Sequence, residues 1–323
     1  MTTVYITVDT EYSSGMANGP CPAERAENYA RSIACITQDG PSGLTYKLQR
    51  LEEYGQKAVF FVDPMPALVW GVAAIEDIVA PILNAGQDVQ LHCHTEWLGI
   101  AGADNPFGVT GDHIKDFALE DQCRILEWAR DTLVAAGARM PVAFRAGNYG
   151  ANDDTLRALR QIGIRYDSSH TPGIIDGHCA ISLGPDDRQA MLHKGIVEVP
   201  AGCIATIGGG LRHAQICALS LREMTDAIRH ARNEGLPCFT LVSHSFELVN
   251  RRTLQPNKII RARFDGLCRS LQAMRGVRTG TYHDDPPLPD PSKHSTEPLP
   301  ADAWRSSVRV AEQLVSNTLY GAL

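Results

Sequence analysis

The chain has 323 residues, of which 44% are hydrophobic and 21% are charged, so it can bury a large core in one or two domains. Its 37 acidic and 30 basic residues give a formal net charge of −7. Nucleic acids and anionic membranes are bound through clustered Lys and Arg. This balance therefore argues against both partners and favours a neutral or mildly charged substrate.

The N-terminus leads directly into an apolar segment at residues 4–8, without the basic region and long apolar stretch of a secretory signal. No run of about 20 apolar residues occurs that could span a membrane. The nine cysteines are an odd number without CxxC spacing, which is typical of reduced thiols rather than of a disulfide framework. We therefore expect a cytoplasmic protein that does not associate with a membrane.

Strand-like and helix-like segments alternate along the chain. Seven short, mostly apolar segments are expected to be strands, and such segments are typical of parallel strands that are buried on both faces. They lie at 4–8, 58–62, 88–93, 142–145, 164–167, 196–200 and 238–243.

Helical patterns fill most of the gaps, and several end at a glycine just before the next strand. Because glycine tolerates the left-handed conformation at a helix C-terminus, these glycines are read as helix stops. The predicted helices are 44–54, 75–85, 119–136 and 155–162, followed by Gly55, Gly86, Gly137 and Gly163. A capping-box pattern at Ser220-Leu221-Arg222-Glu223 opens a further helix that ends near Gly235.

Repeated βα units form either a closed barrel or an open doubly wound sheet, and in both the functional groups lie at the C-terminal ends of the strands. Polar residues follow the predicted strands at this end, and we expect them to converge on one mouth. They are Asp9, Glu11, Asp63, His92, His94, Glu96, Arg145, Asp167 and His244. The histidines at 113, 213, 230 and 294 lie in polar stretches and are expected to be solvated.

The C-terminal part differs in composition from the rest. Residues 284–300 hold six prolines and are expected to be an extended connector, and residues 301–319 could form an amphipathic helix. We therefore divide the chain into a catalytic α/β domain (1–283), a Pro-rich connector (284–300) and a helical tail (301–323). The tail is expected to pack on the domain or to form a homo-oligomer, with a disordered end as the alternative.

The segment Leu91-His92-Cys93-His94-Thr95-Glu96-Trp97 places two imidazoles and a carboxylate where an apolar strand ends. Such a cluster can supply two or three ligands to Zn²⁺ or a similar divalent ion. In an extended backbone His92, His94 and Glu96 share one face, whereas in a helix His92 and Glu96 become neighbours. The sequence leaves these pairings open, and the structural alternative is that the histidines are hydrogen-bonded core or surface groups.

The segment Asp9-Thr10-Glu11 brings two carboxylates to the end of the first strand. One of them could bind the metal while the other, kept ionised, removes a proton from the attacking water. The alternative for Asp9 is a structural role as a cap of the following loop.

Two further segments carry groups of catalytic type. Arg145 ends a strand and begins a glycine-bracketed loop, so it could hold a catalytic carboxylate, and loop N–H groups near Tyr149 could stabilise an oxyanion. His244 follows the last strand and could protonate a leaving group. A surface ion pair and a turn are the structural alternatives for the Arg145 segment.

Taken in order, these segments resemble the NodB-type polysaccharide deacetylases, carbohydrate esterase family four. Residues 7–11 resemble the family's TFDD segment, 92–96 its HxxxH segment, 144–150 its RxPY segment and 241–244 its LxxH segment. The stretch RAGNYGANDDTLRAL is the most specific match. Asp167 is present for the remaining segment, but the expected tryptophan is not.

The resemblance implies a distorted (β/α)7 barrel, in agreement with the seven predicted strands. It also implies that Asp9 is the general base, that His92 is a metal ligand, that Arg145 orients Asp9 and that His244 is the general acid. The implied reaction is hydrolysis of an N-acetyl or related acyl group of an amino sugar or surface-polysaccharide precursor, with Zn²⁺ as the expected ion.

Three departures from the family pattern bear on the metal site. The second aspartate of the first segment falls on Thr10, so Glu11 must replace it, and the second histidine of HxxxH falls on Glu96, which leaves Glu96 or His94 as a ligand. The third segment is one residue longer than RxPY. These changes are similar to an atypical branch with D-x-E and H-x-H-x-E-W segments, associated with bacterial surface-polysaccharide biosynthesis.

Two other functions are compatible with the sequence. Relatives of this fold open cyclic amides without a metal, and the altered first segment permits that here. A carbohydrate-binding protein whose catalytic set has decayed is the other alternative. The retained Asp9, Arg145 and His244 argue against it, because a binding module needs neither a base nor an acid.

Overall fold

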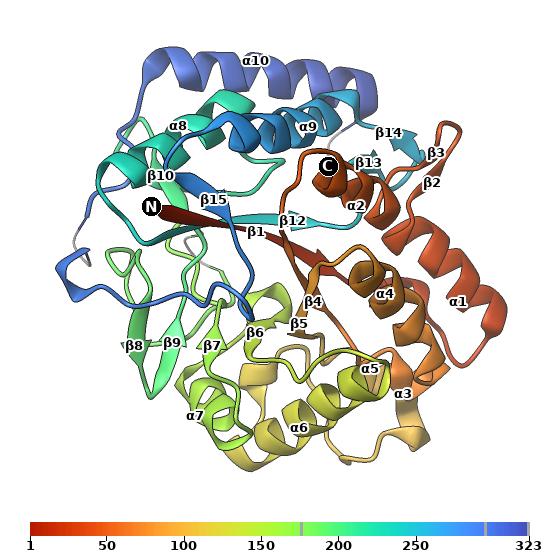
Figure 1. Ribbon diagram of the computed structural model, residues 1–323. Helices are drawn as coiled ribbons and strands as arrows, with labels where there is room; N and C mark the ends of the chain where they lie inside the picture. Colours follow the sequence, from red (N-terminus) through yellow and green to blue (C-terminus); the bar gives the residue numbers. More distant parts are fainter. Residues whose placement is uncertain (175–176, 294–295, 322–323) are drawn as a thin grey trace.

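The computed structural model describes residues 1–174, 177–293 and 296–321. A nine-stranded sheet forms its centre, and helices cover the outside of that sheet (Figure 1). Parallel strands follow the order β12-β1-β4-β5-β6-β7-β9, with β8 antiparallel to β9 and β15 parallel to β1. The predicted fold class, a distorted (β/α)7 barrel, is confirmed.

Each of the seven predicted strands is present in the parallel path. They are β1 (Thr2–Thr10), β4 (Val59–Val62), β5 (Asp88–Cys93), β6 (Ala143–Ala146), β7 (Tyr166–Asp167), β9 (Ile196–Glu198) and β12 (Cys238–His244). The strands β8 (Met191–His193) and β15 (Val277–Thr279) were not predicted. Short pairs complete the strands as β2 (Ile36–Thr37) with β3 (Gly40–Pro41), β10 (Cys203–Ala205) with β11 (Leu211–His213), and β13 (Val249–Asn250) with β14 (Gln255–Pro256).

The predicted helices are also present, as α2 (Leu44–Glu53), α4 (Ala73–Asn84), α6 (Leu119–Ala135), α7 (Asp153–Gln161) and α8 (Leu221–Asn233). The glycines read as helix stops have φ between 62° and 98°, and Ser220 and Glu223 form the predicted capping box. Helices that were not predicted are α1 (Pro22–Asn28), α3 (Ala67–Trp70), α5 (Trp97–Ala101) and α9 (Lys258–Ala273). Single turns lie at Ser14–Met16, Tyr29–Ile33, Gly102–Asp104, Ile114–Asp116, Gly147–Tyr149 and Pro291–Lys293.

The distortion of the barrel lies between β9 and β12. Irregular segments span this side, and single backbone hydrogen bonds join them to β12. The Gly202 amide donates to the Thr240 carbonyl (2.9 Å), the Ala214 amide to the Gly202 carbonyl (2.7 Å) and the Val242 amide to the Ala214 carbonyl (3.0 Å). One part of the barrel wall is therefore built from loops.

The interior of the barrel at the N-terminal ends of the strands is filled by aromatic rings. Tyr282, in the segment after β15, lies 5.1 Å from the Tyr5 ring, 5.9 Å from the Phe61 ring and 5.6 Å from the Tyr166 ring between centroids. Its backbone amide donates to Asp88 Oδ2 (3.1 Å) at the start of β5. This aromatic layer closes the barrel below the C-terminal mouth.

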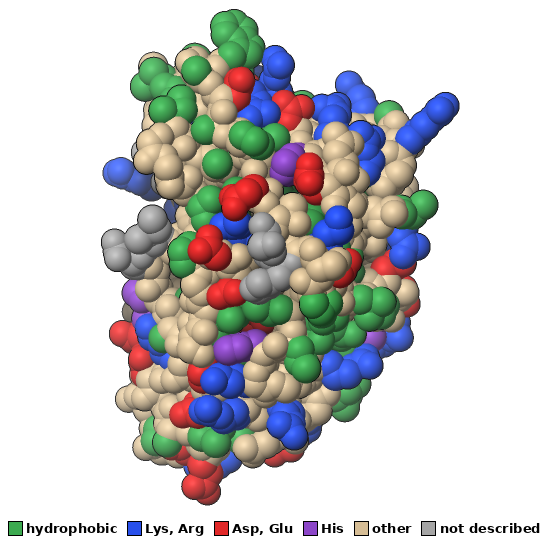
Figure 2. Space-filling view, turned by 90° about the vertical axis from the view of Figure 1, so that its left-hand side faces the viewer, with side chains coloured by type: hydrophobic (Ala, Val, Ile, Leu, Met, Phe, Trp, Pro, Cys, Tyr) green, Lys and Arg blue, Asp and Glu red, His purple; other side chains and the backbone are tan. Residues whose placement is uncertain are grey.

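Helix α10 (Ala303–Tyr320) lies outside α8 and α9 (Figure 1). It is attached to α9 by an ion pair of Arg263 with Glu312 (2.8 Å) and to the N-cap of α9 by a hydrogen bond from Asn257 Nδ2 to Ser316 Oγ (2.8 Å). Its outer side keeps apolar side chains exposed, such as Trp304 (65%), and Figure 2 shows hydrophobic side chains at the top of the molecule, where α10 lies. Residues 322–323 of the predicted tail lie outside the described residues, and the domain boundaries and the homo-oligomer stay predictions.

The surface carries charges of both signs. On the face drawn in Figure 2, basic side chains are interspersed with acidic ones rather than gathered in one patch. None of the helices within the described ranges is long and apolar enough to cross a membrane. The nine cysteines are free thiols.

We predict that Tyr282→Ala lowers the free energy of unfolding by about 3–5 kcal/mol, because it empties the centre of the aromatic layer. Chemical denaturation followed by circular dichroism measures this change. Tyr282→Phe is the control, since it keeps the ring, and its stability should stay close to that of the wild type. Equal stability of the Ala variant and the wild type would contradict the role of the layer.

Candidate active site

A cavity of about 250 Å³ lies at the C-terminal ends of the strands. It is lined by residues from β1, β5, the loop after β6, the loop after β7 and β12. They are Asp9, Glu11, His92, His94, Ala146, Asn148, Tyr149, Thr171, Ile174, Gly177, His178 and His244. The structure thus brings most of the predicted site residues to one mouth.

The pleat of the strands explains which residues reach the cavity. Side chains alternate between the two faces of a strand, so Asp9 and Glu11 point the same way, as do His92 and His94. Thr10, which lies between the two carboxylates, is turned away from this face, and its hydroxyl donates to the Val8 carbonyl (3.2 Å). The D-x-E and H-x-H spacings are therefore the ones that present paired ligands to the interior of the barrel.

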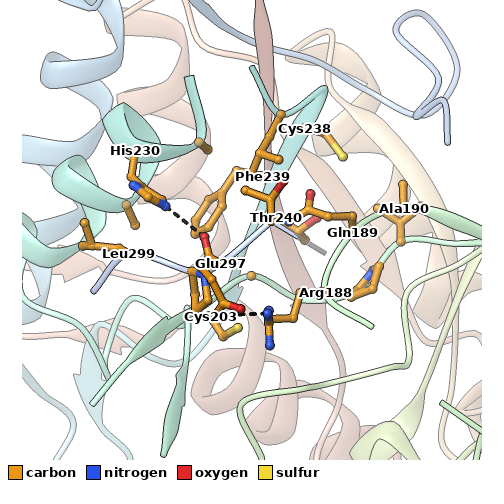
Figure 3. Close-up of a pocket in the computed structure, with 18 residues that line it drawn as sticks. Arg188, Gln189, Ala190, Cys203, His230, Cys238, Phe239, Thr240, Glu297 and Leu299 are labelled. Carbon is orange, nitrogen blue, oxygen red and sulfur yellow. Dashed lines mark hydrogen bonds and ion pairs between the residues drawn. The ribbon is translucent and has the colours of Figure 1, made fainter. Parts of the chain in front are cut away.

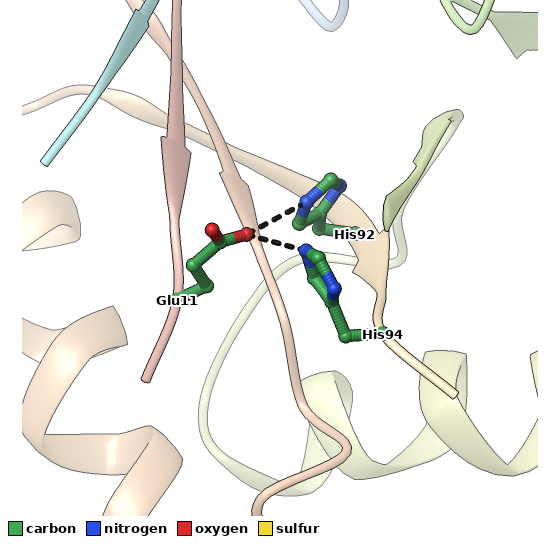
Figure 4. Close-up of side chains that lie close together, drawn as sticks. All are labelled: Glu11, His92 and His94. Carbon is green, nitrogen blue, oxygen red and sulfur yellow. Dashed lines mark hydrogen bonds and ion pairs between the residues drawn. The ribbon is translucent and has the colours of Figure 1, made fainter. Parts of the chain in front are cut away.

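Glu11, His92 and His94 form a compact cluster whose ligand atoms lie within 4.8 Å of one another (Figure 4). Glu11 Oε2 lies 3.0 Å from His92 Nε2 and 2.7 Å from His94 Nε2. Both imidazole nitrogens point at the same carboxylate oxygen. A carboxylate and two imidazoles are a ligand set that suits Zn²⁺.

The hydrogen bonding of the His92 ring shows that these residues fit a metal ion. His92 Nδ1 lies 2.7 Å from the Arg145 carbonyl, which only accepts hydrogen bonds, so Nδ1 carries the proton. In neutral His92, Nε2 then offers a lone pair to a carboxylate oxygen, and such a contact is stable only with a proton or a cation at Nε2. Because metal-bound imidazoles commonly donate from their other nitrogen in this way, the residues fit a divalent ion.

Glu96 lies on the far side of His94. Its Oε2 is 3.3 Å from His94 Nδ1, and its Oε1 accepts from Asn148 Nδ2 at 3.3 Å. Of the two candidates that the sequence left open, His94 thus joins the cluster with Glu11 and His92, while Glu96 holds its ring. Burial alone would raise the pKa of Glu11, but the charge of His94 and the hydrogen bonds of both histidines hold that pKa well below its usual range.

Arg145 lies beneath the cavity and is fully buried. Its Nη1 donates to Asp9 Oδ1 (2.7 Å) and to Thr7 Oγ1 (2.8 Å), its Nη2 donates to Ser168 Oγ (3.0 Å), and its guanidinium lies 4.5 Å from the Phe61 ring centre. Burial favours the uncharged form, but the Asp9 carboxylate more than offsets it, so the pKa of Arg145 is raised. Arg145 therefore stays charged and fixes one oxygen of Asp9.

His244 faces the other oxygen of Asp9. Its Nε2 lies 3.8 Å from Asp9 Oδ2, and its Nδ1 lies 3.7 Å from Glu247 Oε1 and 3.3 Å from Gln215 Nε2. Burial would lower the pKa of His244, but the hydrogen bond to Glu247 and the charge of Asp9 raise it above its usual value. The imidazole thus has a carboxylate beyond each of its two nitrogens and favours the protonated form.

A buried lysine lies behind Glu247. Lys47 Nζ donates to Ser243 Oγ (2.7 Å), and the Ser243 hydroxyl donates to Glu247 Oε2 (2.7 Å). The charges of His244 and Lys47 help to lower the pKa of Glu247 to about 2 in spite of its burial. Glu247, Ser243 and Lys47 were not among the predicted site residues. The sequence could have indicated Glu247, because it lies three residues after His244. Lys47 lies in a polar stretch of a distant helix, where nothing in the sequence connects it with the site.

The loop after β6 carries Tyr149 to the cavity through a tight turn. Asn148 and Tyr149 both have positive φ, 51° and 58°, which is uncommon for residues with a side chain. Gly147 is required beside them, because a Cβ there would lie 2.7 Å from the Cys93 carbonyl oxygen and 2.8 Å from the His94 ring. This turn places the loop against the cluster of Glu11, His92 and His94.

The prediction that His213 is solvated was wrong. Its ring is buried, with Nε2 3.2 Å from the Tyr149 hydroxyl, and burial lowers its pKa to about 3. The polar neighbours of His213 belong to a β-hairpin that folds back onto the barrel, which the local sequence does not indicate. His113 and His230 are only half-buried. Residue 294, the remaining histidine of that group, lies outside the described residues.

Asp63 and Asp167 do not belong to the described lining of the cavity, contrary to the expectation of one shared mouth. Asp63 Oδ1 accepts from the backbone amides of Met65 (3.1 Å) and His94 (3.3 Å), so it supports the segment that carries His94. Asp167 accepts from the Ser169 hydroxyl (2.8 Å) and lies beside buried Glu198. Both are buried supports of neighbouring strands.

A separate cavity lies between β12, α8 and residues 296–299 (Figure 3). Its volume is about 30 Å³, which leaves room for about two water molecules. Glu297 crosses it, with its carboxylate 3.3 Å from Arg188 Nη2 and its carbonyl 2.9 Å from His230 Nε2. This cavity is too small for a sugar, so the mouth of the barrel is the candidate site.

No protein-family model matches the sequence, and no curated protein matches it. Among solved structures, a candidate polysaccharide deacetylase from Mycobacterium smegmatis has a TM-score of 0.53 at 17% identity, covering 86% of each chain. The chain has the polysaccharide deacetylase fold. A family 4 carbohydrate esterase from Streptomyces lividans in complex with acetate follows at a TM-score of 0.45 and 14% identity, covering 90% of this chain and 98% of that chain. A peptidoglycan deacetylase from Bacillus subtilis has a TM-score of 0.40 at 12% identity, covering 97% and 94%.

We predict that Glu247→Gln lowers the pKa of His244, because it removes the negative charge beside Nδ1. The ring resonances of His244, followed by NMR as the pH is varied, give this pKa directly. Glu52→Gln, at an exposed position of α2, is the matched control and should leave the titration unchanged. An unaltered titration in Glu247→Gln would show that Glu247 does not act on His244.

Proposed function

We propose that the protein is a metal-dependent deacetylase that removes an N-acetyl or related acyl group from an amino sugar or surface-polysaccharide precursor in the cytoplasm. One observation carries the proposal. Asp9 and His244 face each other at 3.8 Å beside the Glu11, His92 and His94 cluster, and all five residues line one cavity. A base, an acid and a metal-binding cluster thus meet at the mouth of a fold shared with polysaccharide deacetylases.

The metal site consists of Glu11, His92 and His94, with Glu96 and the Arg145 carbonyl holding the two rings. A divalent ion held there, with Zn²⁺ as the expected one, supplies Lewis-acid polarisation of the acyl carbonyl. An ion can reach the ligands because the cluster is partly open to the cavity. Both Nε2 atoms already point at the same oxygen of Glu11.

Asp9 is the general base in this proposal. Arg145 holds its Oδ1, so Oδ2 is the oxygen that is free to take a proton from water as the water oxygen attacks the acyl carbon. The Arg145 guanidinium fixes the orientation of the Asp9 carboxylate for this step. Backbone N–H groups of the turn at Asn148 and Tyr149 stabilise the negative oxygen that develops on the acyl carbon.

His244 completes the reaction as the general acid. Its raised pKa favours the protonated ring, and Nε2 gives its proton to the amine nitrogen as the carbon–nitrogen bond breaks. Acetate and the free amino sugar leave. The proton that Asp9 has taken from water balances the proton that His244 has given.

Two alternatives are less well supported by the geometry. A metal-independent opening of cyclic amides gives no role to the cluster of Glu11, His92 and His94. A decayed binding protein has no use for the buried Arg145–Asp9 pair or for the charged partner behind His244, since both fix proton-transfer groups.

We predict that the purified protein binds about one Zn²⁺ per chain and that His94→Ala abolishes this binding. Glu96→Gln should weaken it only by about 10–100-fold, because Glu96 acts through the His94 ring. Inductively coupled plasma mass spectrometry and calorimetric titration measure the stoichiometry and the affinity.

His230→Ala, a histidine away from the cavity, is the control. Complete loss in Glu96→Gln with retention in His94→Ala would exchange the roles of the two residues, and no binding at all would favour the metal-independent alternative.

We predict that Asp9→Asn lowers kcat on acetylated amino sugars by about 10²–10⁴-fold, because it removes the proton acceptor. Its Zn²⁺ affinity should stay near that of the wild type, since Asp9 is not in the cluster. Acetate release measures the rate, and Asp112→Asn at an exposed site is the matched control. Activity equal to that of the wild type in Asp9→Asn would overturn the assignment of the base.

A further inference from the structure

A larger space continues from the catalytic cavity. This apolar groove, lined by described residues from 170–174, 177–185 and 209–211, has a volume of about 520 Å³. It shares Thr171, Ile174 and Gly177 with the lining of the cavity. Its volume lies within the roughly 300–1,000 Å³ of sites that take small organic ligands. A substrate in the cavity can therefore extend into the groove.

The walls of the groove are aliphatic. Ile174, Ile181, Leu183 and Leu211 contribute most of the bulk, together with two prolines and a cysteine. Among the described lining residues there is no Asp, Glu, Lys, Arg, Tyr, Trp or Phe. Of the two ring nitrogens of His170, Nε2 is engaged 3.0 Å from the Gly184 carbonyl. Besides the Thr171 hydroxyl, the described lining offers few side-chain groups that could pair with a polar ligand.

This lining argues against a second sugar unit as the occupant. Each sugar hydroxyl placed against aliphatic walls would lose its water without gaining a partner, and such unpaired groups are costly. A hydrocarbon chain loses nothing by leaving water and gains from burial.

The rim of the groove has the same character. Ile174 is 37% exposed, and Ile207 is 64% exposed in the turn that also holds Gly209 and Gly210. These two side chains extend the apolar lining to the rim of the groove.

We propose that the apolar groove binds a hydrocarbon chain carried by the amino-sugar substrate. The proposal rests on the deacetylase function proposed above, and it names an amphipathic substrate class, an N-acylated amino sugar that bears an alkyl or acyl chain. The chain can be attached in two ways, through the scissile acyl group or through the glycosidic oxygen.

Two substrate series distinguish these attachments. One consists of alkyl glycosides of N-acetylglucosamine from methyl to octyl, and the other of N-acyl glucosamines from acetyl to octanoyl, all used below the concentration at which they form micelles. In one series kcat/KM should rise by up to about fourfold for each added methylene that is buried. A flat response in both series would overturn the proposal.

Two variants test whether the dependence on chain length arises in the groove. Ile174→Asn and Leu211→Asn should flatten the dependence on chain length, and neither side chain is fully buried, so both variants should fold. Leu192→Asn is the matched control, because Leu192 is 70% exposed on β8 and lies outside the groove. A dependence on chain length that survives in both groove variants would overturn the proposal.

Binding to Asp9→Asn separates this proposal from the deacetylase function. Calorimetry with the shortest and the longest member of each series requires no turnover, and in one series the longest member should bind at least tenfold more tightly. If the wild type hydrolyses no acetylated sugar but keeps this binding preference, and Ile174→Asn loses it, the groove proposal holds and the deacetylase function fails. Equal binding of the shortest and longest members in both series would overturn the groove even in an active enzyme.

Discussion

The contact between Arg145 and Asp9 is the interaction on which the site depends. Arg145 is fully buried, and its guanidinium lies on the aromatic layer that fills the lower barrel while it donates to Asp9 on the upper side. The same residue uses its backbone carbonyl to fix the ring of His92. Removing one partner of such a buried pair typically costs about 3–5 kcal/mol, because it leaves an uncompensated charge. Asp9, the proposed base, and His92, a proposed metal ligand, are therefore held by a single residue that cannot be exchanged without cost.

A second consequence concerns the two carboxylates of the first strand. With adjacent carboxylates, only one could point into the barrel from a regular strand, and the other would need a bend to reach the metal. The D-x-E spacing puts both on the inner face, and the longer side chain of Glu11 reaches both imidazoles from beyond the end of β1. The H-x-H spacing on β5 follows the same period. The departures at Thr10 and Glu96 thus form one consistent arrangement rather than two separate losses.

The sequence was most informative where structure is local. Strands of four to eight apolar residues, glycines at helix ends and the Ser220 capping box are all recognised within a few residues, and all were found at the predicted positions. The strand-end rule then placed His92, Asp9 and His244 together although they are far apart in the chain. The choice between His94 and Glu96 could not be made, because it depends on the exact backbone path after β5 and on the side chain of Glu11.

What the sequence missed lies mostly in long-range packing and in the irregular wall between β9 and β12. Lys47 reaches Ser243 across 196 positions, and His213 reaches Tyr149 through a hairpin that has no regular pattern. That wall also supplies Gly209, Gly210 and Leu211 to the apolar groove, and the other described lining residues come from the long loop between β7 and β8. The regular side of the barrel therefore carries the proposed proton-transfer and metal-binding groups, which require fixed strand geometry. The loops carry the proposed apolar groove, and they can change without disturbing Asp9 or His92.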